Sequence, residues 1–458
     1  MRSKRSAHRS TEVKRHLGLI GSDEPRFEVQ LRGYPARQRR LNYIMMSPEI
    51  VIIGGGIIGC TTAYYLSRHP SYSSSTSTIT LIEASRNGPA QGASGKAGGL
   101  VARWAYPKEI ADLSFEEHCK LAKEHNGRDR WGWRYVRCGS WEGRGEAVID
   151  SEQKGIDTNK NLAKTLGLPS GVKPATSSKY RVSRKVMDLP EDLLWVKGDL
   201  TDSYSPIARD GETAQVHPYL FTTSMFELAK ANGVNFIEGR AISIVQDLDG
   251  KVTGVEYIMH QDHIRKTAEK ETVPATHVIV AAGAWSSAIV HQLPISATRA
   301  HSITIRPKQG VTISPYVLFT EISDPNPAPP SKASSPEVYA RPDNEVYACG
   351  PGDDCPLPDT VDDVIVDQPS CELIYTHVSS ISQELREGTV EKRQACYLPS
   401  VSSGGGPIIG EADQIAKGLF IATGHTCWVR QLNWRCWRLC LIFYLGNFER
   451  TRNCKGIN

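Results

Sequence analysis

The chain has 458 residues, of which 40% are hydrophobic and 23% charged, and its formal net charge is +4. The length exceeds what one hydrophobic core ordinarily organises, so we expect a globular protein of more than one domain. No run approaches the roughly 20 apolar residues of a membrane-spanning helix, so we expect no membrane span. So small a net charge says little about partners, and we expect no nucleic-acid partner.

The N-terminal segment is basic, with eleven Lys or Arg against four Asp or Glu in residues 1–44. This Arg-rich composition resembles a mitochondrial targeting peptide, but the four acidic residues argue against that interpretation. We expect residues 1–45 to be a disordered extension, or upstream sequence joined to a protein that begins at Met45 or Met46.

The eleven cysteines are scattered, with no CxxC pair and no secretory signal at the N-terminus. A reducing compartment fits this pattern, so we expect a cytoplasmic protein, with a mitochondrial or endosome-associated location as alternatives. Cys349 and Cys355, with Asp353 and Asp354 between them, could suggest a metal ligand set. A Gly/Pro/Asp loop, CGPGDDCPLPD, explains them better, and we predict no metal site.

The first predicted elements form a βαβ unit. The apolar run EIVII at 49–53 predicts a strand, residues 57–67 have helical character, and ITLIEA at 79–84 predicts a second strand. A right-handed crossover brings the carboxyl ends of both strands to one edge of a parallel sheet.

The later elements follow in chain order. Amphipathic segments at 110–127 and 158–168 lie in a long stretch with no dominant period, and HPYLFTTSMFELAKANGV at 217–234 predicts a helix. EVYARPDNEVYACG predicts a hairpin that turns at Asp343 and Asn344. We expect strands at 235–246 and 251–259, a buried strand entering a glycine turn at 276–287, and a Pro/Ser loop at 323–337.

The glycines after the first strand are spaced as GxGxxG. The first glycine allows a tight turn, the second lets backbone amides approach a pyrophosphate, and the third lets the helix pack closely on the strand. The helix start offers N–H groups to phosphate, and the carboxylate at the end of the second strand accepts hydrogen bonds from the ribose hydroxyls. We therefore predict a dinucleotide site made by Gly54, Gly56, Ile57, Ile58, Gly59, Glu83 and Ala84.

Three further glycine-containing turns favour an extended FAD over a nicotinamide cofactor, which remains a distant alternative. They lie in GASGKAGGL, VIVAAGAW and GLFIATGHTCW, two of them directly after apolar strands. Separated turns that converge on one ligand suit a long cofactor. The candidate residues here are Ser94, Gly95, Lys96, Ala97, Gly98, Gly99, Leu100, Ala282, Gly283, Gly424 and His425.

These motifs in this order resemble the D-amino-acid oxidase/glycine oxidase superfamily of FAD-dependent oxidoreductases, with the closest likeness to its fungal oxidoreductase members. The resemblance covers residues 46–428. It implies an α/β fold in which a Rossmann-like FAD-binding domain is interleaved with an α+β substrate domain built on an antiparallel sheet. The implied FAD domain is 46–115 with 211–300 and 396–428, and the implied substrate domain is 116–210 with 301–395.

The resemblance also implies a chemistry. A hydride passes from a C–N bond of an amine or amino-acid-like substrate to the flavin, and O₂ or another electron acceptor reoxidises it. Lys96 stands where some relatives attach flavin covalently through His, so non-covalent FAD is implied.

The chain departs from the family at the expected carboxylate clamp. Relatives that oxidise amino acids place an Arg before Pro where this chain reads Cys396-Tyr397-Leu398-Pro399, and Leu cannot replace a bidentate cation. Arg341 on the predicted hairpin is an alternative group for a substrate anion, although a solvated turn arginine explains it as well. Tyr397 and His217 are weaker candidates.

The second departure is the tail, residues 429–458, which lacks the glycine-rich helix start that contacts the flavin ring in relatives. We expect it to be atypical sequence that impairs flavin binding; a membrane-binding amphipathic tail is the alternative. These departures also leave open a catalytically weak or inactive scaffold in intracellular, for example endosomal, trafficking.

Overall fold

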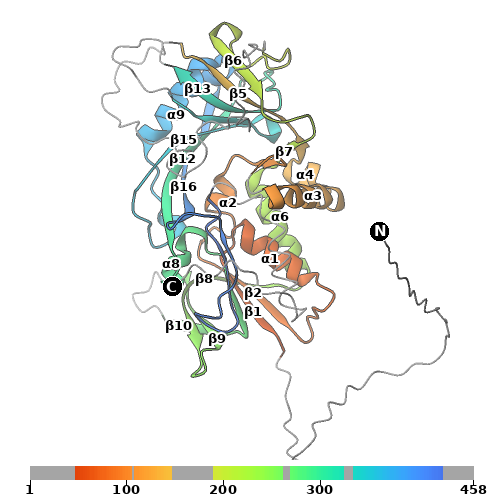
Figure 1. The fold of residues 1–458 in the computed structure, drawn as a ribbon, viewed down its shortest axis with the longest axis vertical. Coiled ribbons are helices and arrows are strands. Elements are labelled where there is room, and N and C mark those ends of the chain that lie inside the picture. Colours follow the sequence, from red (N-terminus) through yellow and green to blue (C-terminus); the bar gives the residue numbers. More distant parts are fainter. Residues whose placement is uncertain (1–46, 106–107, 147–188, 261–268, 324–333, 427–458) are drawn as a thin grey trace, which may run out of the picture. The chain divides into compact units, whose positions relative to one another are not determined.

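The computed structural model describes residues 47–105, 108–146, 189–260, 269–323 and 334–426. The predicted extension at 1–45, the amphipathic segment at 158–168 and the tail at 429–458 lie outside these residues. Most of the predicted Pro/Ser loop lies outside them too. The fold below is that of the described part of residues 47–458 (Figure 1).

The first sheet confirms the predicted βαβ unit. Its central strands β8, β2, β1, β11 and β18 are all parallel, and antiparallel strands extend it at both edges. Among the described residues it has eight strands, in the order β10 (Lys270–Pro274), β9 (Val252–Met259), β8 (Asn235–Gln246), β2 (Thr78–Glu83), β1 (Glu49–Ile53), β11 (His277–Val280), β18 (Leu419–Thr423) and β17 (Ile408–Glu411).

The second sheet is antiparallel except where β13 pairs with β5. Its hairpin of β14 and β15 confirms the predicted turn, because Asp343 and Asn344 both have positive φ. Within the described residues it has seven strands, in the order β16 (Thr389–Val401), β12 (Ile295–Arg306), β15 (Val346–Asp353), β14 (Glu337–Ala340), β13 (Tyr316–Ser323), β5 (Arg137–Arg144) and β6 (Thr201–Pro206).

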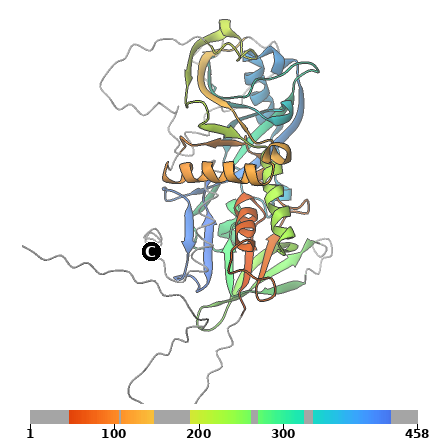
Figure 2. The ribbon, with the colours of Figure 1, turned by 90° about the vertical axis from the view of Figure 1, so that its right-hand side faces the viewer.

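A small third sheet and the helices complete the fold. The third sheet joins β3 (Leu100–Ala102), β7 (Thr213–Gln215) and β4 (Arg134–Tyr135). Figure 2 shows α3 crossing the view between the two large sheets. The helices are α1 (Ile57–Ser67), α2 (Ala93–Lys96), α3 (Lys108–Glu124), α4 (Gly127–Trp131), α6 (Pro218–Ala231), α8 (Ser286–Ile289), α9 (Gln368–Ile381) and α10 (Gln383–Arg386), with short 3-10 turns η1 (Gly198–Leu200), η2 (Gly283–Trp285), η3 (Pro342–Asn344) and η4 (Val361–Asp363).

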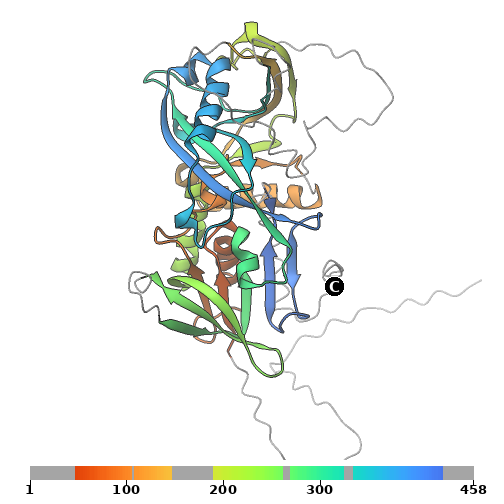
Figure 3. The ribbon, with the colours of Figure 1, turned by 90° about the vertical axis from the view of Figure 1, so that its left-hand side faces the viewer.

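The parallel strands are buried on both faces, which explains their continuous apolar runs. Ile50 and Ile52 of β1 pack in one hydrophobic cluster with α1 and α6, whereas Val51 and Ile53 pack in another on the opposite face. Helix α1 contains no charged residue, because the sheet and α6 cover most of its surface. Helix α9 lies against the second sheet (Figure 3), and its Ile374 is buried in a hydrophobic cluster with side chains of the strands.

The two large sheets take their strands from alternating parts of the chain. The first uses 49–83, 235–280 and 408–423, while the second uses 137–144, 201–206, 295–353 and 389–401. We propose on this ground the division into an FAD-binding and a substrate domain that the sequence predicted. No helix of the described residues has the length and apolar character to cross a membrane.

A leucine pair tests the core of the second sheet. Leu318 on β13 is fully buried, whereas Leu248 is fully exposed. We expect Leu318→Ala to lower the free energy of unfolding by about 2–5 kcal/mol, because it removes buried methyl groups and leaves a cavity. Leu248→Ala serves as the control and should change it by less than about 0.5 kcal/mol in urea denaturation. Equal effects of the two substitutions would contradict the described core.

Candidate functional site

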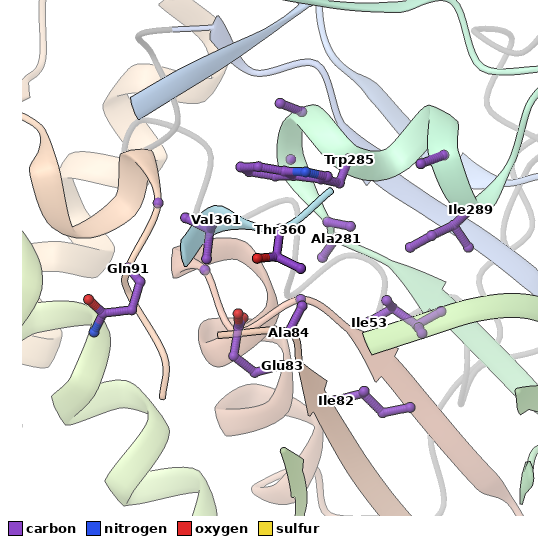
Figure 4. A pocket seen from close by; sticks show the side chains of 18 of the residues that line it. Ile53, Ile82, Glu83, Ala84, Gln91, Ala281, Trp285, Ile289, Thr360 and Val361 are labelled. Atoms are coloured by element: carbon purple, nitrogen blue, oxygen red, sulfur yellow. The ribbon is translucent and has the colours of Figure 1, made fainter. Parts of the chain in front are cut away.

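A pocket lies at the carboxyl ends of the five parallel strands β8, β2, β1, β11 and β18. Residues at or just beyond the carboxyl ends of β2, β1, β11 and β18 line it, together with residues that follow the part of β8 paired with β2, which is where open α/β sheets bind ligands. Figure 4 shows Ile53 and Ile82 at the ends of β1 and β2, and Ala281, directly after β11, beside Trp285 and Ile289.

The GxGxxG turn has the geometry that its three glycines predict. Gly54 has φ of 109°, and a Cβ there would lie 2.5 Å from the carbonyl oxygen of Ala281. A Cβ on Gly59 would lie 1.9 Å from the carbonyl oxygen of Gly54, so only glycine lets α1 pack this closely on the turn. The first turn of α1 therefore faces the pocket with amides that have no acceptor within the helix.

Glu83, at the end of β2, is buried and bonded to the glycine turn. One carboxylate oxygen accepts the Gly55 amide at 2.5 Å and the other accepts the Ser85 amide at 2.8 Å. Burial raises the pKa of Glu83 to about 7, and the nearby Asp362 adds to this, whereas the amide hydrogen bonds oppose it. The carboxylate lines the pocket at the position expected for a ribose.

The small-residue turn at 92–99 joins the glycine turn directly. The Ser94 hydroxyl accepts the Ile57 amide at 2.9 Å, and it lies 3.0 Å from where a Cβ on Gly56 would stand. Gly95 is also required, because its Cβ would meet the carbonyl oxygen of Ala90 at 2.0 Å. The two glycine-containing segments thus form one continuous wall of backbone and small side chains.

The far end of this turn is fixed to the second sheet. The Lys96 ammonium donates to the carbonyl oxygen of Ala395 at 3.1 Å, and the Gln394 side-chain amide donates to the carbonyl oxygen of Lys96 at 3.2 Å. The ring of Tyr339 lies against Gly98, where a Cβ would be 2.8 Å from it. Burial lowers the pKa of Lys96, and the nearby Cys396 and Asp362 partly oppose that shift.

Arg341 belongs to the same connection. It is 2% exposed, forms an ion pair with Glu345 at 2.8 Å, and donates hydrogen bonds to the carbonyl oxygens of Ala97 and Gly98. Its guanidinium also stacks over the Tyr347 ring at 4.6 Å. The positive charge is thus neutralised within the protein, which argues against the predicted role of Arg341 in binding a substrate anion. The alternative of a solvated turn arginine is wrong, because the side chain is buried.

Position 398, where the resemblance placed a carboxylate clamp, is apolar in its surroundings as well as in its side chain. Leu398 is buried and clusters with Ala300 and Cys396, against which Ala93 packs. The Tyr397 hydroxyl points instead toward the loop after β15, where it donates to the carbonyl oxygen of Pro356 at 2.6 Å. His217 caps α6, accepting the Leu220 amide.

About half of the predicted cofactor residues line the pocket, and the rest hold its walls. Gly59, Gly95 and the 96–100 segment act through packing and hydrogen bonds behind the surface. Ile57 contacts Ser94 through its amide, and Gly424 has the positive φ of a glycine turn beside His425. The predicted cofactor residues that line the pocket are Gly54, Gly56, Ile58, Glu83, Ala84, Ser94, Ala282, Gly283 and His425.

Sequence reasoning missed several pocket residues, including two groups that lie far from the glycine motif in the sequence. Arg240 and Ala241 follow the parallel part of β8, and the rule that ligands lie beyond strand ends would have found them. The residues 359–361 come from the loop after β15, and no local pattern indicates that this loop returns to the first sheet. Within the described residues no cluster of His, Cys, Asp and Glu is arranged to hold a metal ion; Asp353 pairs with Arg299.

The residues present fit a flavin adenine dinucleotide. The glycine turn leaves room for a pyrophosphate, Glu83 offers its carboxylate to a ribose, and the turn at 92–99 continues from there to the second sheet. This combination defines a dinucleotide-binding oxidoreductase of the Rossmann type.

The chain belongs to the DAO family of FAD-dependent oxidoreductases, which it matches over residues 49–429. It is 33% identical to "Putative oxidoreductase TDA3" of Saccharomyces cerevisiae over 470 residues, covering 83% of this chain and 88% of that protein. It is 32% identical to "Putative oxidoreductase C1F5.03c" of Schizosaccharomyces pombe over 391 residues, covering 83% and 90%.

Solved structures support the same fold. Glycine oxidase from Geobacillus kaustophilus superposes with a TM-score of 0.61 at 15% identity, covering 89% of this chain and 98% of that structure. Iminodiacetate oxidase from Chelativorans sp. BNC1 superposes with a TM-score of 0.58 at 18% identity, covering 88% and 96%. The predicted fold class and family resemblance are therefore confirmed.

The third glycine of the turn gives a direct test of the cradle. Gly59→Ala places a methyl group against the Gly54 carbonyl, so α1 must shift away from the turn. We expect FAD affinity to fall by at least about a hundredfold, since one displaced helix start alters every amide that faces the phosphates. Gly406→Ala is the control, because a Cβ there meets nothing within 4 Å. Unchanged FAD affinity in titrations of Gly59→Ala would contradict the assignment.

The raised pKa of Glu83 predicts that the folding stability of the cofactor-free protein depends on pH. Its pKa is about 7 when folded and lies near the ordinary 4.5 when unfolded, so the folded state binds the extra proton between these values. Folding stability from this group is full below about pH 4.5 and is lost as the pH rises through 7. Between about pH 4.5 and pH 8 we expect wild type to lose on the order of 2 kcal/mol of stability relative to Glu83→Gln, which has no carboxyl group to titrate at this position. Parallel stability curves of the two proteins against pH would refute this.

Proposed function

We propose that this chain oxidises a C–N bond of an amine or amino-acid-like substrate, with FAD bound non-covalently in the pocket. The observation that carries the proposal is the unbroken connection from the glycine turn, through the turn at 92–99, to the second sheet. FAD supplies the acceptor for the substrate's hydride, and the protein supplies position and exclusion of water. The names of the glycine and iminodiacetate oxidases, which share the fold, support an amine substrate.

The residues of the second sheet suggest how the substrate is recognised. Leu398 and its apolar neighbours replace the clamp that the family resemblance implied, and Arg341 is neutralised by Glu345. Neither position offers a cation to a substrate carboxylate. We infer that recognition depends on the amine and its carbon substituents, and that a carboxylate adds little binding energy at these positions.

In this reaction, the protein residues around the small-residue turn position it and do not react with the substrate. Lys96, Gln394 and Arg341 hold the small-residue turn against the sheet, and Tyr339 packs on that turn at Gly98. These contacts fix the wall beside which substrate and cofactor meet. Positioning of this kind supplies a large share of the rate in enzymes whose cofactor carries the chemistry.

A substrate panel tests the proposal. FAD-loaded protein is mixed without O₂ with primary amines, N-methyl amines and D-amino acids, and flavin reduction is followed by stopped flow, with H₂O₂ release measured in air. We expect reduction by at least one amine, and within a pair such as methylamine and glycine the carboxylate should raise kcat/KM by less than about tenfold. Acid precipitation should leave the flavin in the supernatant.

Gly59→Ala, which we expect to lose FAD, is the control for adventitious oxidation. A protein that holds FAD but is reduced by no member of the panel would contradict the enzymatic proposal and favour the scaffold alternative. Flavin that stays with the precipitate would contradict non-covalent binding.

A further inference from the structure

The loop between β15 and α9, residues 354–367, leaves the second sheet and returns across the dinucleotide pocket of the first. Apart from the single turn η4 it has no regular structure, and irregular connections of this length in compact proteins are usually functional. Its residues Asp359, Thr360 and Val361 line the pocket. Figure 4 shows Thr360 and Val361 close to Glu83 and Ala84.

Both ends of this loop are held by the second sheet. At its start, the Asp353 carboxylate accepts hydrogen bonds from the Arg299 guanidinium at 2.8 Å and from the Cys355 amide at 3.0 Å. At its end, Asp367 caps α9 by accepting the Ser370 amide, and Arg299 donates to the carbonyl oxygen of Ile365 at 2.9 Å. The ends are therefore fixed independently of the pocket.

The middle of the loop is attached through the Asp362 carboxylate to the segment that follows β2, and Asp359 forms a more exposed ion pair with Arg240 of β8 at 3.7 Å. One oxygen of Asp362 accepts the Ser85 hydroxyl at 2.6 Å, and the other accepts the Arg86 amide at 2.9 Å. The Asp362 side chain is 9% exposed, and its pKa is lowered because these hydrogen bonds outweigh the effect of burial. Hydrogen bonds to a buried, ionised group are stronger than neutral ones.

Two aromatic residues extend the attachment along the pocket. The Trp285 indole donates to the carbonyl oxygen of Pro358 at 2.7 Å, and the Tyr397 hydroxyl donates to that of Pro356. Both rings also line the pocket. The loop therefore lies along the cavity, held by hydrogen bonds to residues that line the same space.

We propose that residues 354–367 form a strap over the bound dinucleotide and that Asp362, fastened to Ser85 and Arg86, is a cofactor-retaining residue. The inference rests on the proposed FAD site and adds a function for a segment that the glycine motif does not include. Release of FAD requires the Asp362 contacts to open, so their strength governs the release rate.

The test uses two substitutions that remove the same hydrogen bond from opposite sides. Asp362→Ala removes the carboxylate, and Ser85→Ala removes its hydroxyl partner without changing any charge. The control, Asp354→Ala, removes an equal charge from an exposed position of the same loop. FAD-loaded proteins are diluted, and dissociation is followed by the rise in flavin fluorescence.

For Asp362→Ala, a purely electrostatic effect and the strap hypothesis predict opposite changes in the rate of FAD release. Removing a negative charge beside an anionic cofactor should by itself slow release, because repulsion falls and Glu83 ionises more readily. The strap predicts that Asp362→Ala and Ser85→Ala release FAD about tenfold faster, with Asp354→Ala within about twofold of wild type. Thermolysin cleavage within 354–367 should be faster in both variants and slower when FAD is bound.

Release from both variants at or below the wild-type rate would overturn the strap while leaving the FAD site intact. Wild-type protein that binds no FAD would overturn the site and the strap together. Melting temperatures of the loaded proteins check folding, and where Asp362→Ala does not fold, Ser85→Ala and Asp362→Asn carry the same comparison.

Discussion

The hydrogen bond from the Gly55 amide to the Glu83 carboxylate is the interaction on which the pocket depends. It joins the end of β2 to the glycine turn after β1, and thus fixes a ribose-binding group beside a phosphate-binding one. Burying this carboxylate has a free-energy cost, which the amides of Gly55 and Ser85 only partly offset. Hydroxyl groups of a bound ribose would supply further donors, so burial of Glu83 favours occupancy of the site.

The turn at 92–99 is a second constraint, because it connects the dinucleotide pocket to the second sheet, where we propose that the substrate is recognised. The turn at 92–99 contacts the glycine turn through Ser94 and the second sheet through Lys96. The buried pair of Arg341 and Glu345 stabilises the same turn from the sheet side. An isolated arginine could not remain buried there, whereas one paired with Glu345 and hydrogen-bonded to two carbonyl oxygens can. We therefore interpret Arg341 as a positioning residue.

The parts of the fold that depend on local pattern could be predicted from the sequence. The βαβ unit, the hairpin at Asp343 and the phosphate-binding glycines follow from periodicity and from backbone conformations that only certain residues adopt. The contact of Arg341 with the turn at 92–99 and the path of the loop that contains Asp362 could not be predicted, because contacts between residues hundreds of positions apart leave no local signal. The departure at Leu398 was visible, but its apolar surroundings became clear only in the structure.

Calorimetric titration of the cofactor-free protein with FAD, FMN and NAD tests the central claim most directly. If Glu83, the glycine turn and the turn at 92–99 together hold one extended cofactor, FAD binds with a stoichiometry of one. FMN, which lacks the adenosine half, and NAD, which lacks the flavin, should then bind at least about a hundredfold more weakly. Equal affinities for FAD and NAD, or no heat with FAD, would contradict the account.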